Sequence, residues 1–321
     1  MTPPLAVVIV NYRTAALALQ CLRSLAREVA DLPRARVVVV DNASGDGSVT
    51  RIAEGIAAGG WGGWASMLPL QVNGGFAAGN DAALRRLLAE PDPPGAFLLL
   101  NPDTIVRPGA LGALLELAES HPRAGVVGSH LEGEDGSARR AAFRFHSVLS
   151  ELEAGLQLGI ASRLLSSWSV PLPVESSAHR ADWVSGASML VRRQVFEDVG
   201  LLDEGYFLYF EEVDFCRRAQ RAGWECWHEP ASRVIHLEGQ ATGVDSANRV
   251  RRVPTYLLES RRRYFIKQHG RAYAILADGA WLGGHLAWRL RMRLQRRPDR
   301  AEPGVLADFC RQSAVVRGVS R

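Results

Sequence analysis

The chain has 321 residues, of which 47% are hydrophobic and 22% charged, which is typical of a folded globular protein and excludes a disordered one. This length allows one large domain, or one domain followed by a smaller part. The four cysteines show no CxxC pair and no disulfide-rich spacing, which favours a reducing, cytosolic setting.

The net charge of +4 is unevenly distributed along the chain. From Arg249 to the end there are 17 basic and 5 acidic residues, a net charge of +12, which leaves −8 for the residues before it. A basic tail of this kind favours an anionic partner, such as a membrane surface, a nucleic acid or a phosphorylated substrate. The first 20 residues lack the order of a signal peptide, and the longest apolar stretch, 272–288, is interrupted by Asp278 and His285. We therefore expect no transmembrane helix.

The first 120 residues repeat one pattern, in which an apolar run is followed by a polar loop and then by a helical segment. The apolar runs lie at 5–12, in the first half of 35–48, at 67–72 and at 96–104. Helical segments follow at 14–30, from the glycine-rich segment 73–81 to about Ala89, and at 109–120. Continuous apolar runs are typical of strands buried on both faces. The pattern predicts a doubly wound α/β fold, with a mostly parallel sheet and helices on both faces.

The second half of the chain is less regular, and residues 140–180 receive no assignment. A loop enters a strand at 182–193, and a helix is expected from Glu211 to Ala222, ended by Gly223. Residues 224–239 predict a pair of short strands, and residues 255–297 predict basic helices. The proline-rich segment 91–95 is too short to separate two domains.

Polar residues follow each of the four predicted strands, at the edge where ligands of such sheets bind. The glycine-rich segment NGGFAAGND (73–81) leads from a strand into a helix, which suits a phosphate, although by itself the segment favours a tight turn. Asp103 is placed to hold a hard divalent cation, yet Asn-Pro-Asp is also an ordinary turn. Asp41 suits a nucleotide base or a ribose hydroxyl, and it suits a helix cap as well.

The segment YFLYFEEVDFCRR (206–218) places three carboxylates, Glu211, Glu212 and Asp214, among aromatic residues. Carboxylates in the first turn of a helix favour its dipole, which would account for all three. The helix dipole lowers the pKa of such carboxyl groups, whereas aromatic neighbours raise it by removing water. Opposing effects of this kind are common where the pKa of a general base is adjusted. His236 is either structural or a ligand of the same cation as Asp103.

Seven motifs, VVIVNY, VVVVDNASGDGS, NGGFAAGND, LLLNPDT, SGASMLVRR, YFEEVDFCRR and VIHLEG, occur in this order. Together they resemble bacterial glycosyltransferase family 2, most closely its rhamnosyltransferase-like branch, over residues 5–243. The resemblance implies a GT-A fold over residues 1–245, with a basic helical extension at 246–321. It also implies an inverting, metal-dependent transfer of a hexose from a nucleoside-diphosphate sugar.

The resemblance also implies roles for individual residues. Glu212 ranks first as the catalytic base and Glu211 second. Asp103 and His236 would bind Mg²⁺ or Mn²⁺, with Asn101 where relatives carry the first Asp of a DxD motif. Asp41 would contact the nucleotide base. The other residues implied at the nucleotide or donor are Asn11, Tyr12, Asn73, Gly74, Gly75, Phe76, Asn80, Gly186 and Ala187.

These features predict a transferase of bacterial cell-surface polysaccharide synthesis, with dTDP-rhamnose as the leading donor and a glycan or lipid-linked acceptor. A UDP-hexose or UDP-galactofuranose transferase, and a nucleotide-sugar-binding protein without catalysis, are the open alternatives. A nucleotidyltransferase is disfavoured because no glycine-rich loop with basic residues follows the first strand. A dinucleotide oxidoreductase is disfavoured because GxGxxG is absent there.

The basic segment WLGGHLAWRLRMRLQRR (281–297) mixes Trp and Leu with five arginines. It suits the surface of an anionic membrane, and it equally suits a helix packed on the domain or in a homo-oligomer. We expect a cytoplasmic protein, free or attached to the inner face of the plasma membrane. No helix-turn-helix or zinc spacing is found, so we expect no nucleic-acid partner.

Overall fold

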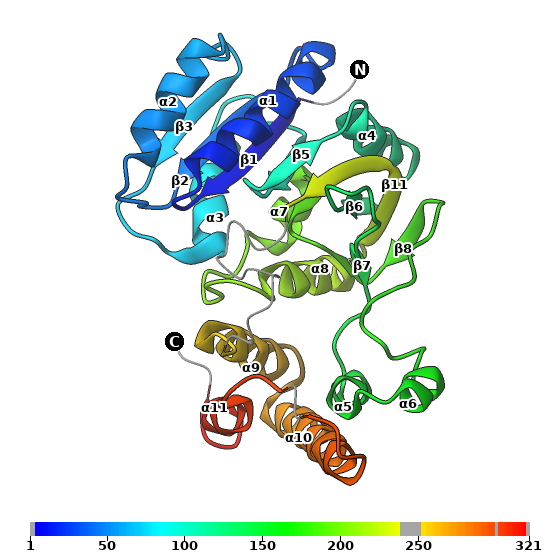
Figure 1. The fold of residues 1–321 in the computed structure, drawn as a ribbon. Helices are drawn as coiled ribbons and strands as arrows, with labels where there is room; N and C mark the ends of the chain where they lie inside the picture. The colour runs from blue at the N-terminus through cyan, green and yellow to red at the C-terminus, as the bar shows by residue number, and fades with distance from the viewer. Residues whose placement is uncertain (1–3, 238–251, 299–300, 319–321) are drawn as a thin grey trace.

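The computed structural model describes residues 4–237, 252–298 and 301–318. Its centre is a nine-stranded sheet in the order β3-β2-β1-β4-β10-β6-β11-β5, with β8 paired to β11 (Figure 1). The first four strands in space are parallel to one another. Their bounds are Ala65–Pro69 for β3, Arg36–Asp41 for β2, Leu5–Asn11 for β1 and Ala96–Leu100 for β4. The predicted mostly parallel sheet is confirmed.

The remaining strands give the sheet a mixed half. β10 (Ser188–Arg192) is antiparallel to β4 and to β6 (Ala124–Glu132). β11 (Glu225–His236) is parallel to β6 and antiparallel to β5 (Thr104–Val106) and β8 (His179–Ala181). A separate two-stranded sheet joins β7 (Ala142–Phe143) and β9 (Trp183–Val184).

The prediction of two short strands at 224–239 is wrong, because this segment forms the single strand β11. Its register against β6 shifts between Glu229 and Arg233. Pro230 lies within this irregularity, where it removes a ladder donor without ending the strand. The polar residues that suggested a turn therefore mark a bulge.

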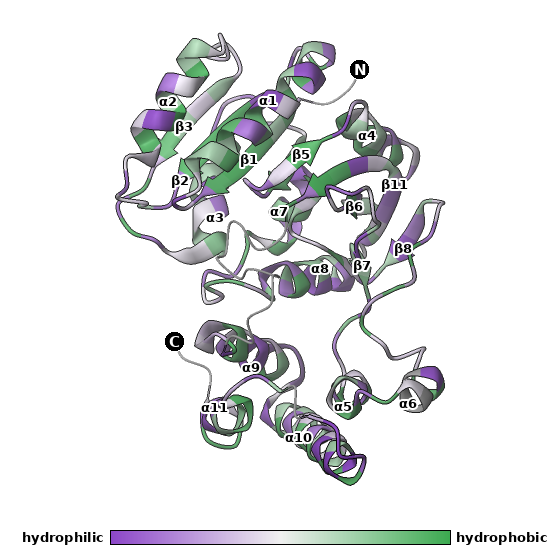
Figure 2. Ribbon diagram, viewed as in Figure 1, coloured by the Kyte–Doolittle hydropathy of each residue, from purple (hydrophilic) through white to green (hydrophobic). Residues whose placement is uncertain are grey.

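Each central strand is buried on both faces, which explains its unbroken apolar sequence (Figure 2). Val7 and Ile9 belong to the core beneath α1 (Ala15–Asp31), α2 (Ser48–Ala58) and α4 (Ala110–Ser120). Val8 and Val10 belong to the opposite core, with α3 (Gly75–Leu88), α7 (Arg193–Val199) and α8 (Glu211–Arg221). Burial of each such side chain contributes about 1.5–3 kcal/mol. Helices on both faces are thus confirmed.

The C-terminal helices gather below the sheet in Figure 1, together with α5 (Val148–Leu156) and α6 (Gly159–Leu164). They are α9 (Thr255–His269), α10 (Arg271–Leu294) and α11 (Val305–Gln312). Tyr264 and Phe265 of α9 join the same core as α8. The predicted division at residue 245 falls outside the described residues and stays a prediction. In the described part of the chain, no helix combines the length and hydrophobicity that spanning a membrane requires.

Candidate active site

A pocket of about 330 Å³ opens at the carboxyl edge of β1, β2 and β4, where the sequence predicted the site. Of the predicted residues, Tyr12, Asn73, Gly75, Phe76 and Asn101 line it. Asn42 and Pro102, from the polar segments that follow predicted strands, line it too. The lining residues that the sequence did not single out are Val10, Phe207, Leu208 and Tyr256. The pocket thus joins the ends of three strands to the segment before α8 and to the first turn of α9.

Two of the predicted residues, Asn11 and Asp41, form a buried pair behind this pocket. They are partners in the β1–β2 register, and Asn11 Nδ2 donates to Asp41 Oδ2 over 2.8 Å. The Asp41 carboxylate also accepts hydrogen bonds from the amide and the hydroxyl of Ser44, at 3.0 and 2.7 Å. At 0% and 2% exposure, the two side chains fix the loops that follow β1 and β2.

The glycine-rich loop is held by hydrogen bonds to two other segments. Asn42 Nδ2 donates to Asn73 Oδ1 and to the carbonyl of Gly75, each over 2.9 Å. Gly75 has φ of +87°, and a Cβ atom there would lie 2.0 Å from the carbonyl oxygen of Phe207. That same oxygen accepts from the Phe76 amide over 2.8 Å. The position therefore requires glycine, because any side chain would separate the loop from the segment before α8.

The two residues predicted to bind metal lie side by side. Antiparallel pairing places His236 opposite Thr104, and His236 Nε2 lies 3.4 Å from Asp103 Oδ1. Asp103 is 2% exposed, and its carbonyl accepts from the amide of Leu237 over 2.9 Å. An imidazole nitrogen beside a carboxylate oxygen suits Mn²⁺ or a similar divalent cation. Among the described residues, no group of three His, Cys, Asp or Glu side chains gathers around one point.

The segment that enters α8 has strained backbone geometry. Tyr209 and Phe210 have φ of 69° and 71°, a region that bulky side chains rarely adopt. Arg13 and Ala43, in the loops that follow β1 and β2, also have positive φ. Strain of this kind persists only where the surrounding structure enforces it, and it concentrates at functional sites.

The three carboxylates of α8 divide into two kinds. Asp214 is fully buried and accepts hydrogen bonds from Arg218 over 2.9 Å, Lys267 over 2.8 Å and Gln268 over 2.5 Å. By contrast, the Oε2 atoms of Glu211 and Glu212 have no hydrogen-bond partner. Asp214 therefore anchors α8 to α9, while the two glutamates remain available for chemistry.

The two glutamates differ in how they titrate. Burial and the neighbouring charge of Glu212 raise the pKa of Glu211 well above its ordinary value. Burial raises the pKa of Glu212 to about 7. Glu211 is 3% exposed, whereas Glu212 is only partly buried. Glu212 thus combines access with a pKa suited to accepting a proton near neutral pH, which favours its rank as the first candidate base.

Gly186 and Ala187 connect this helix to the pocket. A Cβ atom at Gly186 would lie 3.8 Å from the Cβ atom of Glu212 and 3.6 Å from Cε1 of Phe76, which lines the pocket. The carbonyl of Ala187 accepts from the Asn101 amide over 3.0 Å. The predicted loop is therefore next to both the candidate base and the pocket.

The remaining residues predicted at the donor, Gly74 and Asn80, also lie outside the lining of this pocket. Gly74 is the residue before α3, and Asn80 is buried within α3, where its Nδ2 donates to the carbonyl of Phe76 over 2.9 Å. The Oδ1 atom of Asn80 has no hydrogen-bond partner. Asn80 therefore supports the first turn of α3, and a direct contact with the nucleotide stays a prediction.

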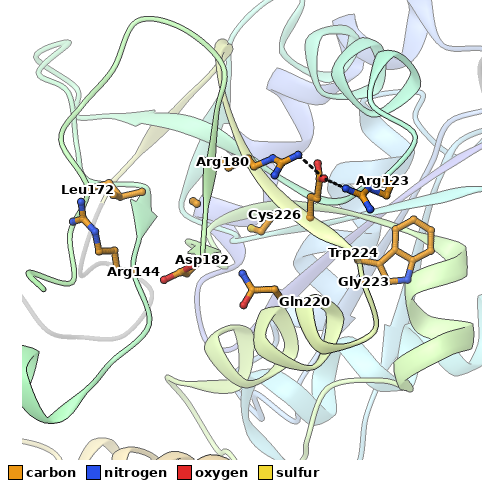
Figure 3. A pocket seen from close by; sticks show the side chains of 11 residues that line it. Arg123, Arg144, Leu172, Arg180, Asp182, Gln220, Gly223, Trp224 and Cys226 are labelled. Carbon is orange, nitrogen blue, oxygen red and sulfur yellow. Dashed lines mark hydrogen bonds and ion pairs between the residues drawn. The ribbon is translucent and has the colours of Figure 1, made fainter. Parts of the chain in front are cut away.

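A second cavity, of about 500 Å³, lies at the opposite edge of the sheet, where β6 and β11 begin (Figure 3). Arg123, Arg144 and Arg180 line it. Glu225 accepts from Arg180 over 2.6 Å and pairs with Arg123 at 3.1 Å, so these two guanidinium charges are already compensated. This cavity contains none of the predicted site residues and stands apart from the candidate active site.

The fold and the site are those of a glycosyltransferase, and the comparisons with known proteins agree. The model of the family described as "Glycosyltransferase like family 2" matches residues 3–255. The chain belongs to this family, and its fold is GT-A. The resemblance seen in the sequence motifs is therefore confirmed.

The relatives to which this chain is similar in sequence include rhamnosyltransferases. The chain is 29% identical over 243 residues to the N-acetylglucosaminyl-diphospho-decaprenol L-rhamnosyltransferase of Mycobacterium tuberculosis, covering 72% of this chain and 73% of that protein. It is 32% identical over 140 residues to the rhamnosyltransferase WbbL of Escherichia coli, covering 44% and 51% of the two chains.

Solved structures support the same fold at low sequence identity. A mannosyltransferase of Pyrobaculum calidifontis, in complex with GDP-Man and Mn²⁺, gives a TM-score of 0.57 at 14% identity over 92% of this chain and 76% of that one. GalNAc-T7 with UDP, GalNAc and Mn²⁺ gives a TM-score of 0.60 at 14% identity over 96% and 57%. Divalent metal is thus present in neighbours of this fold.

Proposed function

We propose that this glycosyltransferase moves rhamnose from dTDP-rhamnose to a hydroxyl group of a glycan or lipid-linked acceptor, with inversion at the anomeric carbon. We further propose that the product belongs to a bacterial cell-surface polysaccharide. The observation that carries the reaction is the Oε2 atom of Glu212, which has no hydrogen-bond partner, on a residue that lies against Gly186, next to the pocket residue Phe76. The two rhamnosyltransferases among the relatives support the choice of sugar.

The chain's own residues supply positioning and proton transfer. The nucleotide lies in the pocket between the loops that follow β1, β2 and β3, whose conformation Asn11, Asp41 and Asn42 hold. Glu212 accepts the proton of the acceptor hydroxyl as its oxygen attacks the anomeric carbon. The bond from this carbon to the diphosphate oxygen breaks as the new one forms. A single displacement of this kind inverts the configuration.

Asp103 and His236 are the residues that would hold Mg²⁺ or Mn²⁺. When bound, the cation stabilises negative charge on the departing diphosphate. Two protein ligands suit a cation that also takes phosphate oxygens and water, as Mg²⁺ commonly does in sites that bind nucleotides. We therefore expect the protein to bind the cation only weakly when no nucleotide is present.

A donor panel tests the proposal directly. The purified chain is incubated with dTDP-rhamnose, UDP-glucose, UDP-N-acetylglucosamine, UDP-galactofuranose and GDP-mannose, each with and without Mn²⁺. Binding and hydrolysis are recorded for each donor. Selective, metal-dependent use of dTDP-rhamnose is the expected result.

Two other outcomes would overturn parts of this proposal. Selective use of a UDP-sugar would reject the rhamnosyl donor but keep the transferase. Nucleotide-sugar binding without hydrolysis, and without transfer to N-acetylglucosaminyl-diphospho-prenol, would favour a binding protein. The anomeric configuration of a product, read by NMR, tests inversion separately.

A further inference from the structure

The exposed side of α10 is unusual in composition. From Ala272 to Leu290, every exposed residue of this helix is apolar or glycine. The large side chains among them include Leu276, Leu286 and Leu290, at 63%, 50% and 59% exposure. A surface helix of a globular protein normally turns charged and polar residues toward water. This apolar stripe, which Leu294 extends by one turn at 76% exposure, therefore requires an explanation.

The opposite side of α10 is already covered by the protein itself. Gly155 of α5 and Gly284 of α10 approach so closely that a Cβ atom on either would meet backbone of the other helix, at 2.5 and 2.8 Å. Trp281 stacks on Phe309 of α11 with ring centroids 4.1 Å apart, and Trp288 is 6% exposed. The helix is therefore held in a fixed orientation, with the apolar stripe turned away from the molecule.

Arginines surround the C-terminal half of this stripe. Residues 279–298 contain five arginines and neither Asp nor Glu. At 100° per residue, Arg289 and Arg291 lie on opposite sides of the stripe that contains Leu286 and Leu290. Arg293 lies within the stripe. Arg291 donates to the carbonyl of Gln157, which ties this flank to α5. Figure 2 shows the resulting mixture of hydrophobic and hydrophilic residues along α10.

We infer that α10 lies flat on an anionic phospholipid membrane, with its apolar stripe among the acyl chains and its arginines at the headgroups. Apolar side chains between flanking basic residues are the pattern of helices that lie in the membrane interface. Charge decides against a second copy of the chain, because a two-fold interface on this stripe would bring the same arginines of the two copies together. Anionic lipid instead attracts each of them.

Helix α9 connects this surface to the candidate active site. Tyr256, in its first turn, lines the pocket, and Gly270 separates its end from α10. The 15 residues of α9 span about 22 Å. The inference that α10 binds a membrane does not depend on the proposed reaction. Only the purpose of this binding rests on that reaction. If the acceptor is lipid-linked, α10 brings the pocket to the leaflet that contains it.

Vesicle flotation of the full chain tests the inference without any measurement of activity. Phosphatidylcholine vesicles are compared with vesicles containing 30% phosphatidylglycerol, and the expected partition coefficient is at least about tenfold higher with the anionic lipid. Leu286→Asp with Leu290→Asp should lower it at least about tenfold. Arg293→Gln with Arg297→Gln should lower it about 30-fold, since each basic residue contributes separately.

Matched variants on other helices serve as controls. Ala53→Asp with Ala57→Asp adds the same charges at the same spacing to the exposed side of α2, and Arg23→Gln with Arg27→Gln removes two charges from α1. Both should leave the partition coefficient within about twofold. Circular dichroism melts confirm that every variant folds.

Three outcomes would overturn the inference. The first is a wild-type chain that does not float with anionic vesicles. The second is an equal loss of binding in the control variants. The third is a wild-type dimer, seen by light scattering, that Leu286→Asp with Leu290→Asp converts to a monomer while vesicle binding is absent.

Discussion

Gly186 lies directly against Glu212, with 3.8 Å between the Cβ position at Gly186 and the Cβ atom of Glu212. The two residues come from segments 26 positions apart, the loop between β9 and β10 and the first turn of α8. Phe76, from the glycine-rich loop, is in contact with the same Cβ position at 3.6 Å. The candidate base therefore borders a small space between itself and the pocket, kept open by the missing side chain.

The size of residue 186 should control access to this space. Gly186→Ala places its Cβ at ordinary contact distances, so we expect little change in activity. Gly186→Leu fills the space, and we expect kcat/KM to fall at least about tenfold, because small displacements of reacting groups are costly. Steady-state kinetics with melting temperatures checks this. Equal activity of the leucine variant would remove Gly186 from the site.

Metal dependence should weaken when Asp103 is replaced. Asp103→Ala removes one of the two proposed metal ligands and leaves His236 alone. The Mn²⁺ concentration that gives half-maximal donor turnover should therefore rise at least about tenfold. The exposed Glu134→Ala serves as a control that loses the same charge. Manganese titrations after treatment with EDTA give the comparison. An unchanged titration of the Asp103 variant would exclude it as a ligand.

Asp214 should matter to stability more than the other carboxylates of α8. Asp214→Ala leaves Arg218 and Lys267 without their shared buried partner, and we expect a loss of about 3–5 kcal/mol in the free energy of unfolding. The exposed Asp135→Ala should change it by less than about 0.5 kcal/mol. Urea denaturation measures both. Similar values for the two variants would show that α9 does not anchor α8 through this residue.

Activity should rise with pH through the neutral range. Burial raises the pKa of Glu212 to about 7, so its carboxyl group is protonated, and unable to act as a base, at lower pH. We therefore expect kcat/KM to increase from about pH 6 to pH 8 and then level off. The raised pKa also means that ionisation of Glu212 lowers the free energy of unfolding as the pH rises from about 4.5, its ordinary pKa, to about 7. A rate profile that is flat across it would contradict a role for Glu212 as the base.

Much of the fold could be predicted from the sequence because local signals and burial agree there. The strands around Val7 and Val38 are buried on both faces, so their apolar runs mark them without ambiguity. The bulge at Glu229 to Arg233 was misread because polar residues inside a strand look like a turn. Pairing partners, rather than local composition, hold this segment in the sheet.

The candidate site was predicted where it depends on strand ends and missed where it depends on tertiary packing. The neighbouring positions of Asp103 and His236 were expected from the motif resemblance rather than from a local pattern, and they follow from the pairing of β5 with β11. Phe207 and Tyr256 enter the pocket from the segment before α8 and from α9. Phe207 is an exposed aromatic residue in a loop, and Tyr256 is a half-buried one in the first turn of a helix. Neither pattern by itself indicates a pocket, so the sequence contained no signal for their place.

The most direct test of the central claim is the transfer rate of Glu212→Gln, measured beside Glu211→Gln under saturating donor and Mn²⁺. The account predicts that Glu212→Gln lowers kcat by about 10²–10⁴ while the donor dissociation constant stays within about twofold. Glu211→Gln should retain the larger share of activity. Wild-type transfer by Glu212→Gln, or a greater loss in Glu211→Gln, would contradict the assignment of Glu212 as the base.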